Sequence, residues 1–431
     1  KGLVGWRAFP PPLHVGPLFT IIRRSIAPAV RRVPNHQKFS AEALFQEGWK
    51  GVMKRIFRAV TSYLRQTDKW LWAMCLALSA FSVLLLGGIH DSGNAINAAD
   101  VGLRQIAVQA GAAAIGAAAA VVISRFDYHT LGRLWKLHVP LMYGLVLLTF
   151  LIGEGTAARP EDKSWLRLGP LTLQPTELLK ISLILTLAYH IYKLHDQVNR
   201  PVNLLAICVH GAIPVLLVHF QGDDGTALVI AFIFVGMLFA AGISWKYVVA
   251  AVVAAVAAAP LAWNYVVNPD QKQRILALFD PNADLLGGLY QQYNAKLAIG
   301  SGQIWGKGLF GVSHQYVPEV HNDFILAFIG ESFGYVGCLA VIALFGALCC
   351  KMLHNARRAE DSLGRLICVG VFTLISAQVF VNVGMCLMVL PVIGITLPFL
   401  SADGSSVLAI YLGLGLVLSV YMHTSRNLFS R

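Results

Sequence analysis

Three side chains that could exchange a proton stand close together just ahead of a long apolar block: Glu319, His321 and Asp323. A carboxylate at the start of a helix is commonly an N-cap, and spacing alone favours that structural interpretation for Asp323. A carboxylate there could also act as a general base, by taking the proton from a hydroxyl group that attacks a carbon atom. The residues by themselves leave both interpretations open.

A second pair of charges, Glu177 and Lys180, stands inside an apolar block. Residues three apart lie on the same face of a helix. Because a charge at the bilayer centre costs roughly 2.5–3.5 kcal/mol, such residues usually face a cavity or a partner. The pair is therefore either an ion pair that locks helices together or part of a site in which Glu177 tunes Asp323 and Lys180 binds an anionic group.

The elements that must position these residues are membrane-spanning helices. Hydrophobic residues make up 56% of the 431 residues and charged residues only 13%, whereas a soluble domain carries roughly 25% charged residues. The apolar residues form blocks of about 20, the length needed to cross a hydrocarbon core about 30 Å thick. We therefore predict an all-α polytopic membrane protein with about ten spans.

The ten predicted spans cover about residues 70–89, 105–124, 137–153, 173–192, 203–219, 225–242, 245–265, 322–352, 364–390 and 404–423. The second is rich in Ala and Gly. Because small residues let neighbouring helices approach closely, we expect this helix at the centre of the bundle.

Charges in the loops predict the orientation. Lys and Arg follow the second, fourth, sixth and eighth blocks, on the same side as residues 1–69, which hold 13 Lys or Arg against 3 Asp or Glu. By the positive-inside rule this side is the cytoplasm, and both termini lie there. The net charge of +12 then indicates contact with anionic lipid rather than with nucleic acid. The outer side carries two long loops, residues 154–172 and 266–321, and the second is long enough to be functional.

The sequence divides into four predicted parts. Residues 1–38 read as a poorly ordered basic extension, and residues 39–69 as a basic amphipathic helix on the membrane surface, with a soluble partner-binding helix as the alternative. Residues 70–425 form the membrane domain, and residues 426–431 a cytoplasmic tail.

Four outer segments, taken in order, are similar to those of a known family. They read GTAARPEDKSWLRLGPLTLQPTELLK, HFQGDDGTALV, VPEVHNDFILAFIGESFG and LPVIGITLPFLSADGSS, and the sequence RFDY follows the second predicted span. Over about residues 70–425 the chain resembles the SEDS family (shape, elongation, division and sporulation), whose members include RodA, FtsW and SpoVE. Each segment alone is weak evidence, but four in order within a ten-span pattern are specific.

The resemblance implies a ten-span peptidoglycan glycosyltransferase with a large outer loop between helices 7 and 8. Such enzymes polymerise lipid II, an undecaprenyl-diphosphate-linked precursor, at the outer face of the bacterial cytoplasmic membrane, together with a class B penicillin-binding protein. Within HNDF, Asp323 matches the family's proposed catalytic aspartate, which implies a general base. Because the donor's α-linked diphosphate becomes a β-glycosidic bond, one displacement with inversion suffices, and no covalent carboxylate nucleophile is required.

A diphosphate leaving group needs cations or a divalent metal ion. Candidate cations on the outer side are Arg159, Arg167, Lys180, Arg274, Lys296 and Lys307. The predicted substrate-binding residues are Glu177, Lys180, Arg167, Lys296, His321 and Gln174, the last from the QPTE sequence that resembles the family's QPSE motif. The resemblance implies Mg²⁺ or Mn²⁺ and no organic cofactor. The carboxylate pair suggested for the metal is Asp323 with Glu319.

Three features leave alternatives open. Gln221, Asp223, Gly225 and Thr226 resemble the family's QPDLGT motif, yet they also suit a tight turn with helix caps. The last outer segment reads SADGSS where the family usually reads SYGGSS, so Asp403 replaces a glycine. The SADGSS departure leaves a scaffold without catalysis as an alternative function. The intramembrane charges Glu177 and Lys180 leave a flippase for a lipid-linked precursor as another. The sequence does not decide between roles in elongation, division and sporulation.

Overall fold

The computed structural model describes Lys54 and residues 57–58, 61–91, 101–155, 162–169, 171–280 and 289–428. The chain divides into two compact units, Lys1–Gln66 and Thr67–Arg431. The predicted extension over residues 1–38 and most of the predicted surface helix over residues 39–69 lie outside the described residues, and residues 61–66 are helical.

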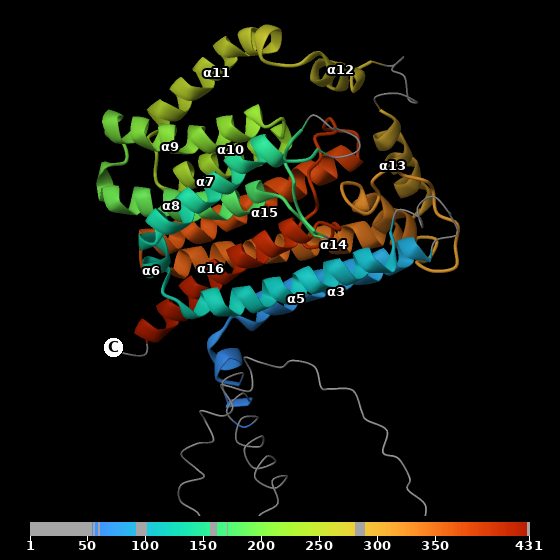
Figure 1. The fold of residues 1–431 in the computed structure, drawn as a ribbon, viewed down its shortest axis with the longest axis horizontal. Coiled ribbons are helices and arrows are strands. Elements are labelled where there is room, and N and C mark those ends of the chain that lie inside the picture. The colour runs from blue at the N-terminus through green and yellow to red at the C-terminus, as the bar shows by residue number, and fades with distance from the viewer. Residues whose placement is uncertain are drawn as a thin grey trace, which may run out of the picture. The chain divides into compact units, whose positions relative to one another are not determined.

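The described part of the second unit contains ten long helices and a few shorter elements (Figure 1). The long helices are α3 (Lys69–His90), α5 (Leu103–Arg125), α7 (Trp135–Ile152), α8 (Pro175–Leu194), α9 (Pro201–Phe220), α10 (Asp224–Ala240), α11 (Trp245–Tyr265), α14 (Ile325–Arg358), α15 (Ser362–Cys386) and α16 (Gly404–Leu428). Each coincides with one of the ten predicted spans, with ends that differ by a few residues.

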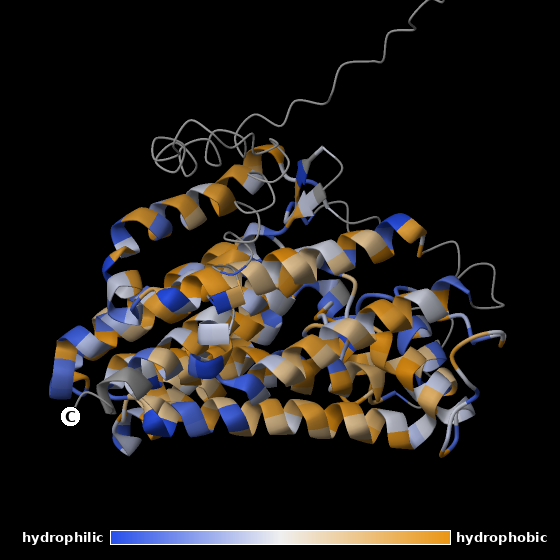
Figure 2. Ribbon diagram, turned by 90° about the horizontal axis from the view of Figure 1, so that it is seen from below, coloured by the Kyte–Doolittle hydropathy of each residue, from blue (hydrophilic) through white to orange (hydrophobic). Residues whose placement is uncertain are grey.

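Eight of these helices are long and apolar enough to cross a membrane. Of the other two, α10 is apolar but only 17 residues long, and α8 carries Glu177 and Lys180 in its first turns. Apolar residues cover the outward surfaces of many helices, whereas polar residues gather toward helix ends (Figure 2). The prediction of an all-α polytopic membrane protein is confirmed.

The centre of the bundle is formed by α15 and α16, of which most side chains are buried. The prediction that α5 is central is wrong: α5 lies beside α3 at one face of the bundle, and few of its residues are buried (Figure 1). Its small residues serve one contact instead. Gly116 and Ala120 lie directly against Tyr411 and Gly415 of α16, which brings the two backbones close together.

The two predicted outer loops contain ordered elements. Strands β1 (Leu166–Leu168) and β2 (Leu171–Leu173) form an antiparallel hairpin in which Leu166 pairs with Leu173. This hairpin leads into α8, which begins at Pro175, a residue suited to the first turn because its missing N–H has no helical partner there. The longer loop contains α12 (Pro269–Ala277) and α13 (Tyr290–Ser301).

Helix α14 is broken at Gly334, which has φ 67° and ψ −165°. The loop after α13 supplies hydrogen bonds at the break: Tyr335 N–H donates to the carbonyl oxygen of Gln303 at 2.9 Å, and Lys307 N–H donates to that of Glu331 at 2.9 Å. Because unpaired backbone groups are costly in a membrane, irregular backbone there persists only where protein or water satisfies it. The loop is therefore an integral part of the spanning bundle.

The contact between α5 and α16 gives a direct test of the packing. A Cβ atom at Gly116 would lie 2.9 Å from Cβ of Tyr411, whereas one at Gly111 on the same helix would meet nothing within 4 Å. We expect Gly116→Ala to lower the melting temperature of the purified protein, because overpacking costs about 1–3 kcal/mol. Gly111→Ala, the matched control, should leave it unchanged or raise it slightly. Equal effects of the two substitutions would contradict this packing.

Candidate functional site

Asp323 lies in a turn immediately before α14 rather than at its N-cap. The N-cap is Phe324, and the first helical residue is Ile325. The capping interpretation of Asp323 is therefore wrong. Asp323 is half-buried, and the start of α14 that it precedes lies at the end of the bundle that also carries α13; we call this the Asp323 end (Figure 1).

The backbone of Asp323 is fixed by a polar side chain of α15. Asn382 Nδ2 donates to the carbonyl oxygen of Asp323 at 2.7 Å and to that of Ile395 at 2.8 Å. Asn382 thereby joins the turn before α14 to the segment between α15 and α16. In that segment Gly394 has φ 73°, and a Cβ atom there would lie 3.6 Å from Oδ2 of Asp323. Glycine thus suits both the backbone conformation and the space beside the carboxylate.

The same two segments are tied together a second time. Ser401 Oγ donates to the carbonyl oxygen of Asn322 at 2.6 Å, and Ala402 N–H donates to that of His321 at 2.9 Å. His321 is buried in this contact. The carboxylate of Asp323 is consequently presented by a turn in which the backbone of Asp323 and of the two residues before it is anchored.

Glu177 and Lys180 form an ion pair within α8. Nζ of Lys180 lies 2.6 Å from Oε1 of Glu177, and the two residues are only 1% and 4% exposed. This confirms the predicted pairing on one helix face.

Two further carboxylates lie near Lys180. Asp223 caps α10 by accepting from Thr226 N–H at 2.9 Å, and it accepts from Gln174 Nε2 at 2.8 Å. Burial raises the pKa of Asp223, although the bond from Thr226 and the charge of Lys180 oppose this effect. The turn-and-cap interpretation of this segment is confirmed, and it also brings a charge to the site.

Asp403 is the other carboxylate near Lys180. It is buried at the start of α16, and burial together with the charge of Glu177 raises its pKa to about 7. Lys180 therefore lies among three carboxylates, those of Glu177, Asp223 and Asp403.

The segment between α15 and α16 connects this buried group to Asp323. Gly394 adjoins the carboxylate of Asp323, and its neighbour Ile393 packs its carbonyl group directly on Gly225 in the first turn of α10. Farther along, Thr396 Oγ1 lies 3.3 Å from Oγ of Ser406 in the first turn of α16. Asp323 and the buried group thus lie at the same end of the bundle, on a common support.

The remaining candidate cations occupy separate positions. Arg167, on the hairpin, pairs with Glu154 at 2.8 Å and is largely exposed, and Lys296 is exposed on α13. Arg274 Nη1 donates to the carbonyl oxygen of Val392 at 3.2 Å. Arg159 lies outside the described residues. Of the predicted substrate-binding residues, the structure gathers Gln174, Glu177 and Lys180 in one group, and it places His321 next to Asp323.

Sequence reasoning missed the function of Glu331 in holding the long loop. This residue of α14 is 1% exposed and accepts from Lys307 Nζ at 2.7 Å and from Gln315 N–H at 3.0 Å. It therefore fastens residues 307–315 onto the broken helix. A carboxylate inside a predicted span was the available signal, since such a residue usually has a partner.

The suggested metal pair offers limited coordination. Glu319 is exposed, and its carboxylate accepts from Asn322 Nδ2 at 2.8 Å. No group of three or more His, Cys, Asp or Glu side chains suited to a metal ion occurs among the described residues. The chemistry of Asp323 and Glu319 is of the kind that Mg²⁺ uses, since this ion is often bound by one or two carboxylates plus substrate phosphates and water.

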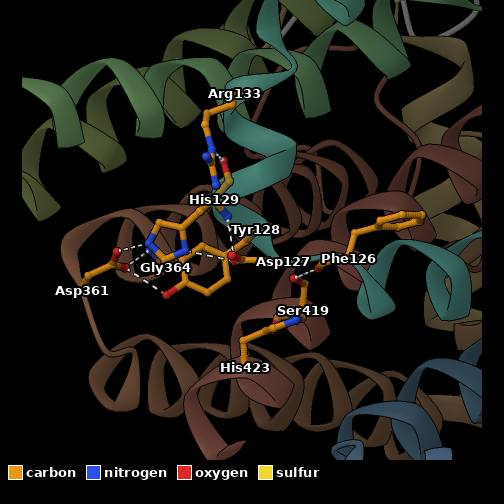
Figure 3. Close-up of polar contacts among 9 residues, drawn as sticks. All are labelled: Phe126, Asp127, Tyr128, His129, Arg133, Asp361, Gly364, Ser419 and His423. Carbon is orange, nitrogen blue, oxygen red and sulfur yellow. Dashed lines mark hydrogen bonds and ion pairs between the residues drawn. The ribbon is translucent and has the colours of Figure 1, made fainter. Parts of the chain in front are cut away.

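A different polar group surrounds α6 (Tyr128–Arg133), which packs against the C-terminal end of α8 (Figure 3). Nδ1 of His129 lies 2.9 Å from Oδ1 of Asp127, and its Nε2 lies 2.6 Å from Oδ2 of Asp361. Burial by itself lowers the pKa of His129, but the bonds to the two carboxylates outweigh burial and raise it. Because Glu177 lies in the first turn of α8, this group and the RFDY sequence belong to the opposite end from the candidate site.

Comparison with known proteins places this arrangement in a family. The sequence profile of FtsW, RodA and SpoVE, described as "Cell cycle protein", matches residues 68–426. The chain belongs to this family.

Two relatives illustrate the match to the FtsW/RodA/SpoVE family. Peptidoglycan glycosyltransferase MrdB of Escherichia coli K12 is 32% identical over 372 residues, which cover 84% of this chain and 95% of MrdB. Probable peptidoglycan glycosyltransferase FtsW of Geobacter metallireducens is 34% identical over 358 residues, which cover 81% of this chain and 90% of that protein.

Solved structures show the same family fold. One matching chain comes from a structure entitled "Structural coordination of polymerization and crosslinking by a peptidoglycan synthase complex". The match has a TM-score of 0.68 and 27% identity, and it covers 83% of this chain and 98% of the matching chain. The crystal structure of the rod shape determining protein RodA of Thermus thermophilus matches with a TM-score of 0.60 and 25% identity, over 82% and 96%.

The buried charges around Lys180 predict a strong effect on stability. Lys180→Met leaves Glu177 in a buried site without its cation, and breaking a buried ion pair in this way costs about 3–5 kcal/mol. We expect a marked loss of melting temperature in detergent. The double variant Glu177→Gln/Lys180→Met removes both charges and should recover much of that loss. A single variant as stable as the wild type, or a double variant no better than the single one, would show that the pair is not buried as described.

Proposed function

We propose that this chain joins lipid II units into glycan strands, with Asp323 as the general base. Its enzyme class follows from family membership: the chain is a peptidoglycan glycosyltransferase, as the names of two relatives indicate, which the match covers to 95% and 90% of their length. The observation that supports the proposed role of Asp323 is its placement, in which a half-buried carboxylate is held by anchored backbone at an end of the membrane bundle.

The chemistry requires one proton transfer and one displacement. The acceptor sugar's hydroxyl oxygen attacks the anomeric carbon of the donor, and the carboxylate of Asp323 takes the hydroxyl proton. A carbon–oxygen bond forms on one face of the sugar while the bond to the diphosphate breaks on the other. The lipid diphosphate leaves with the electron pair of that bond. The displacement inverts the anomeric configuration, and no second carboxylate acts as nucleophile.

The surrounding residues would position the charged substrate. Arg167 and Lys296 are exposed cations that could meet the diphosphate of an approaching lipid. Gln174 and the Glu177–Lys180 pair are buried at the start of α8. Gln174 connects this group to the start of α16 through Ser405, next to the segment that supports Asp323. His321 would contribute through the turn that it shares with Asp323.

A divalent cation, Mg²⁺ or Mn²⁺, would be held by Asp323 and Glu319 together with the substrate's phosphates. When bound, it would neutralise charge on the diphosphate leaving group. No organic cofactor is part of the proposal.

The proposed setting is the bacterial cytoplasmic membrane. The chain is a multi-pass membrane protein. The basic loops support an orientation with both termini in the cytoplasm and the Asp323 end outside. The relation to a peptidoglycan synthase complex supports a class B penicillin-binding protein as partner, and the basic N-terminal segment would contact anionic lipid.

The role of Asp323 can be tested with purified protein and lipid II. We expect Asp323→Asn to lower strand synthesis by about 10²-fold or more, the usual contribution of a general base, without changing the melting temperature. The control Asp280→Asn removes an exposed carboxylate of the long loop and should leave synthesis unchanged. Undiminished synthesis by Asp323→Asn would exclude it as the base. Translocation of lipid II without strand formation would instead favour a flippase, and binding of a penicillin-binding protein without strands a scaffold.

Removal of divalent cations tests the proposed metal. We expect EDTA to reduce strand synthesis and Mg²⁺ or Mn²⁺ to restore it, because the ion would offset charge on the leaving diphosphate. Synthesis that continues unchanged after extensive chelation would rule out this dependence. Product analysis by gel electrophoresis gives the measurement in both cases.

A further inference from the structure

Asp403 is a buried acid that the mechanism above does not use. It lies immediately before α16, and its Oδ1 accepts from Ser405 N–H at 2.9 Å and from Ser406 N–H at 3.3 Å. Only 8% of the residue is exposed. A helix cap explains these two bonds, but it does not explain why an acid is placed beside a buried Glu177.

The elements packed around Asp403 bring charged and titratable groups from several parts of the chain. They are Glu177 and Lys180 from α8, Asp223 from the start of α10, and His321 from the turn before α14. Gln174 links two of these elements, because its Nε2 donates to Asp223 at 2.8 Å and its N–H donates to Ser405 Oγ at 3.1 Å. From α5 comes the neutral amide of Gln109, which donates to the carbonyl oxygen of Ser401 at 2.9 Å.

The protonation state of Asp403 depends on effects that oppose each other. Burial and the neighbouring carboxylate of Glu177 raise its pKa to about 7, against the opposing effects of the Ser406 and Ser405 N–H groups and of Lys180. Lys180 is already paired with Glu177 at 2.6 Å. Near neutral pH, Asp403 can therefore change between a neutral acid and an anion, and the anion adds one negative charge to a site that already holds Glu177, Asp223 and Lys180.

We propose that Asp403 determines substrate affinity at the Asp323 end: its neutral form admits the acidic diphosphate group of the lipid substrate, and its ionised form repels that group. The proposal rests on the proposed function, because it takes a lipid-linked diphosphate as the ligand. Like charges in a poorly solvated site repel each other more strongly than in water. Ionisation of Asp403 would therefore weaken binding of the substrate rather than slow the chemical step.

The test measures binding separately from catalysis. The full chain is reconstituted in nanodiscs, and the dissociation constant of undecaprenyl diphosphate is measured at about pH 6 and about pH 8.5, on either side of the ionisation of Asp403. We expect the affinity of the wild type to fall at least about threefold more between these pH values than that of Asp403→Asn or Asp403→Gly. The ligand's own titration is common to all three proteins and cancels in this comparison. In strand-synthesis assays, the same difference should appear in KM rather than in kcat.

The two substitutions also separate a charge effect from a capping effect. Asparagine retains a side-chain acceptor for the helix start, whereas glycine does not, yet both remove the ionisable group. Equal pH dependence of affinity in the wild type and in Asp403→Asn would overturn the proposal. If none of the proteins makes strands, the proposed function fails, while the ratio of affinities still decides whether Asp403 controls binding of the diphosphate.

A measurement without ligand checks the protonation itself. A carboxyl group whose pKa is raised by folding stabilises the folded state least when it is ionised, so stability is lost as the pH rises from the ordinary carboxyl value through about 7. Asp403→Asn should therefore raise the melting temperature more at about pH 8.5 than at about pH 6. A difference that does not change with pH would show that Asp403 is not neutral in the folded protein, and would refute the proposal.

Discussion

The charge of Lys180 among three carboxylates is the constraint around which the Asp323 end is organised. A buried cation needs close, well-placed partners, because removing charges from water costs several kcal/mol for each ion. Glu177 supplies the direct partner at 2.6 Å, while Asp223 and Asp403 come from the starts of α10 and α16. Each of these two acids also caps its helix. One buried lysine is thus surrounded by acids from the starts of three helices, α8, α10 and α16.

The segment between α15 and α16 converts that arrangement into a support for Asp323. Asn382 binds the carbonyl oxygens of Asp323 and Ile395, while Ser401 binds that of Asn322. These bonds to the backbone hold the turn that carries the half-buried Asp323 at the end of the bundle. A base held in this way is positioned before substrate arrives, which removes part of the entropic cost of bringing the reacting groups together.

Hydropathy predicted the ten helices, because crossing a bilayer imposes a length and a composition that the sequence shows directly. The same reasoning failed where the outcome depended on a partner far along the chain. The small residues of α5 indicate a close neighbour, and only the structure shows that the neighbour is Tyr411 at one face. Asp323 resembled a cap because residues 401–402, which hold its turn, are distant in sequence. In the sequence, Asp403 is only a departure from the SYGGSS motif. The structure shows that the start of α8 lies close to it, because Gln174 binds Ser405.

The most direct measurement of the central claim is a structure of the full chain in a lipid bilayer with a non-reactive lipid II analogue bound. We expect the acceptor hydroxyl to lie within hydrogen-bond reach of the Asp323 carboxylate, at about 2.6–3.2 Å. We also expect the analogue's diphosphate at the Asp323 end, near the segment between α15 and α16. An acceptor hydroxyl far from Asp323, or an analogue bound at the α6 end, would show that Asp323 is not the base.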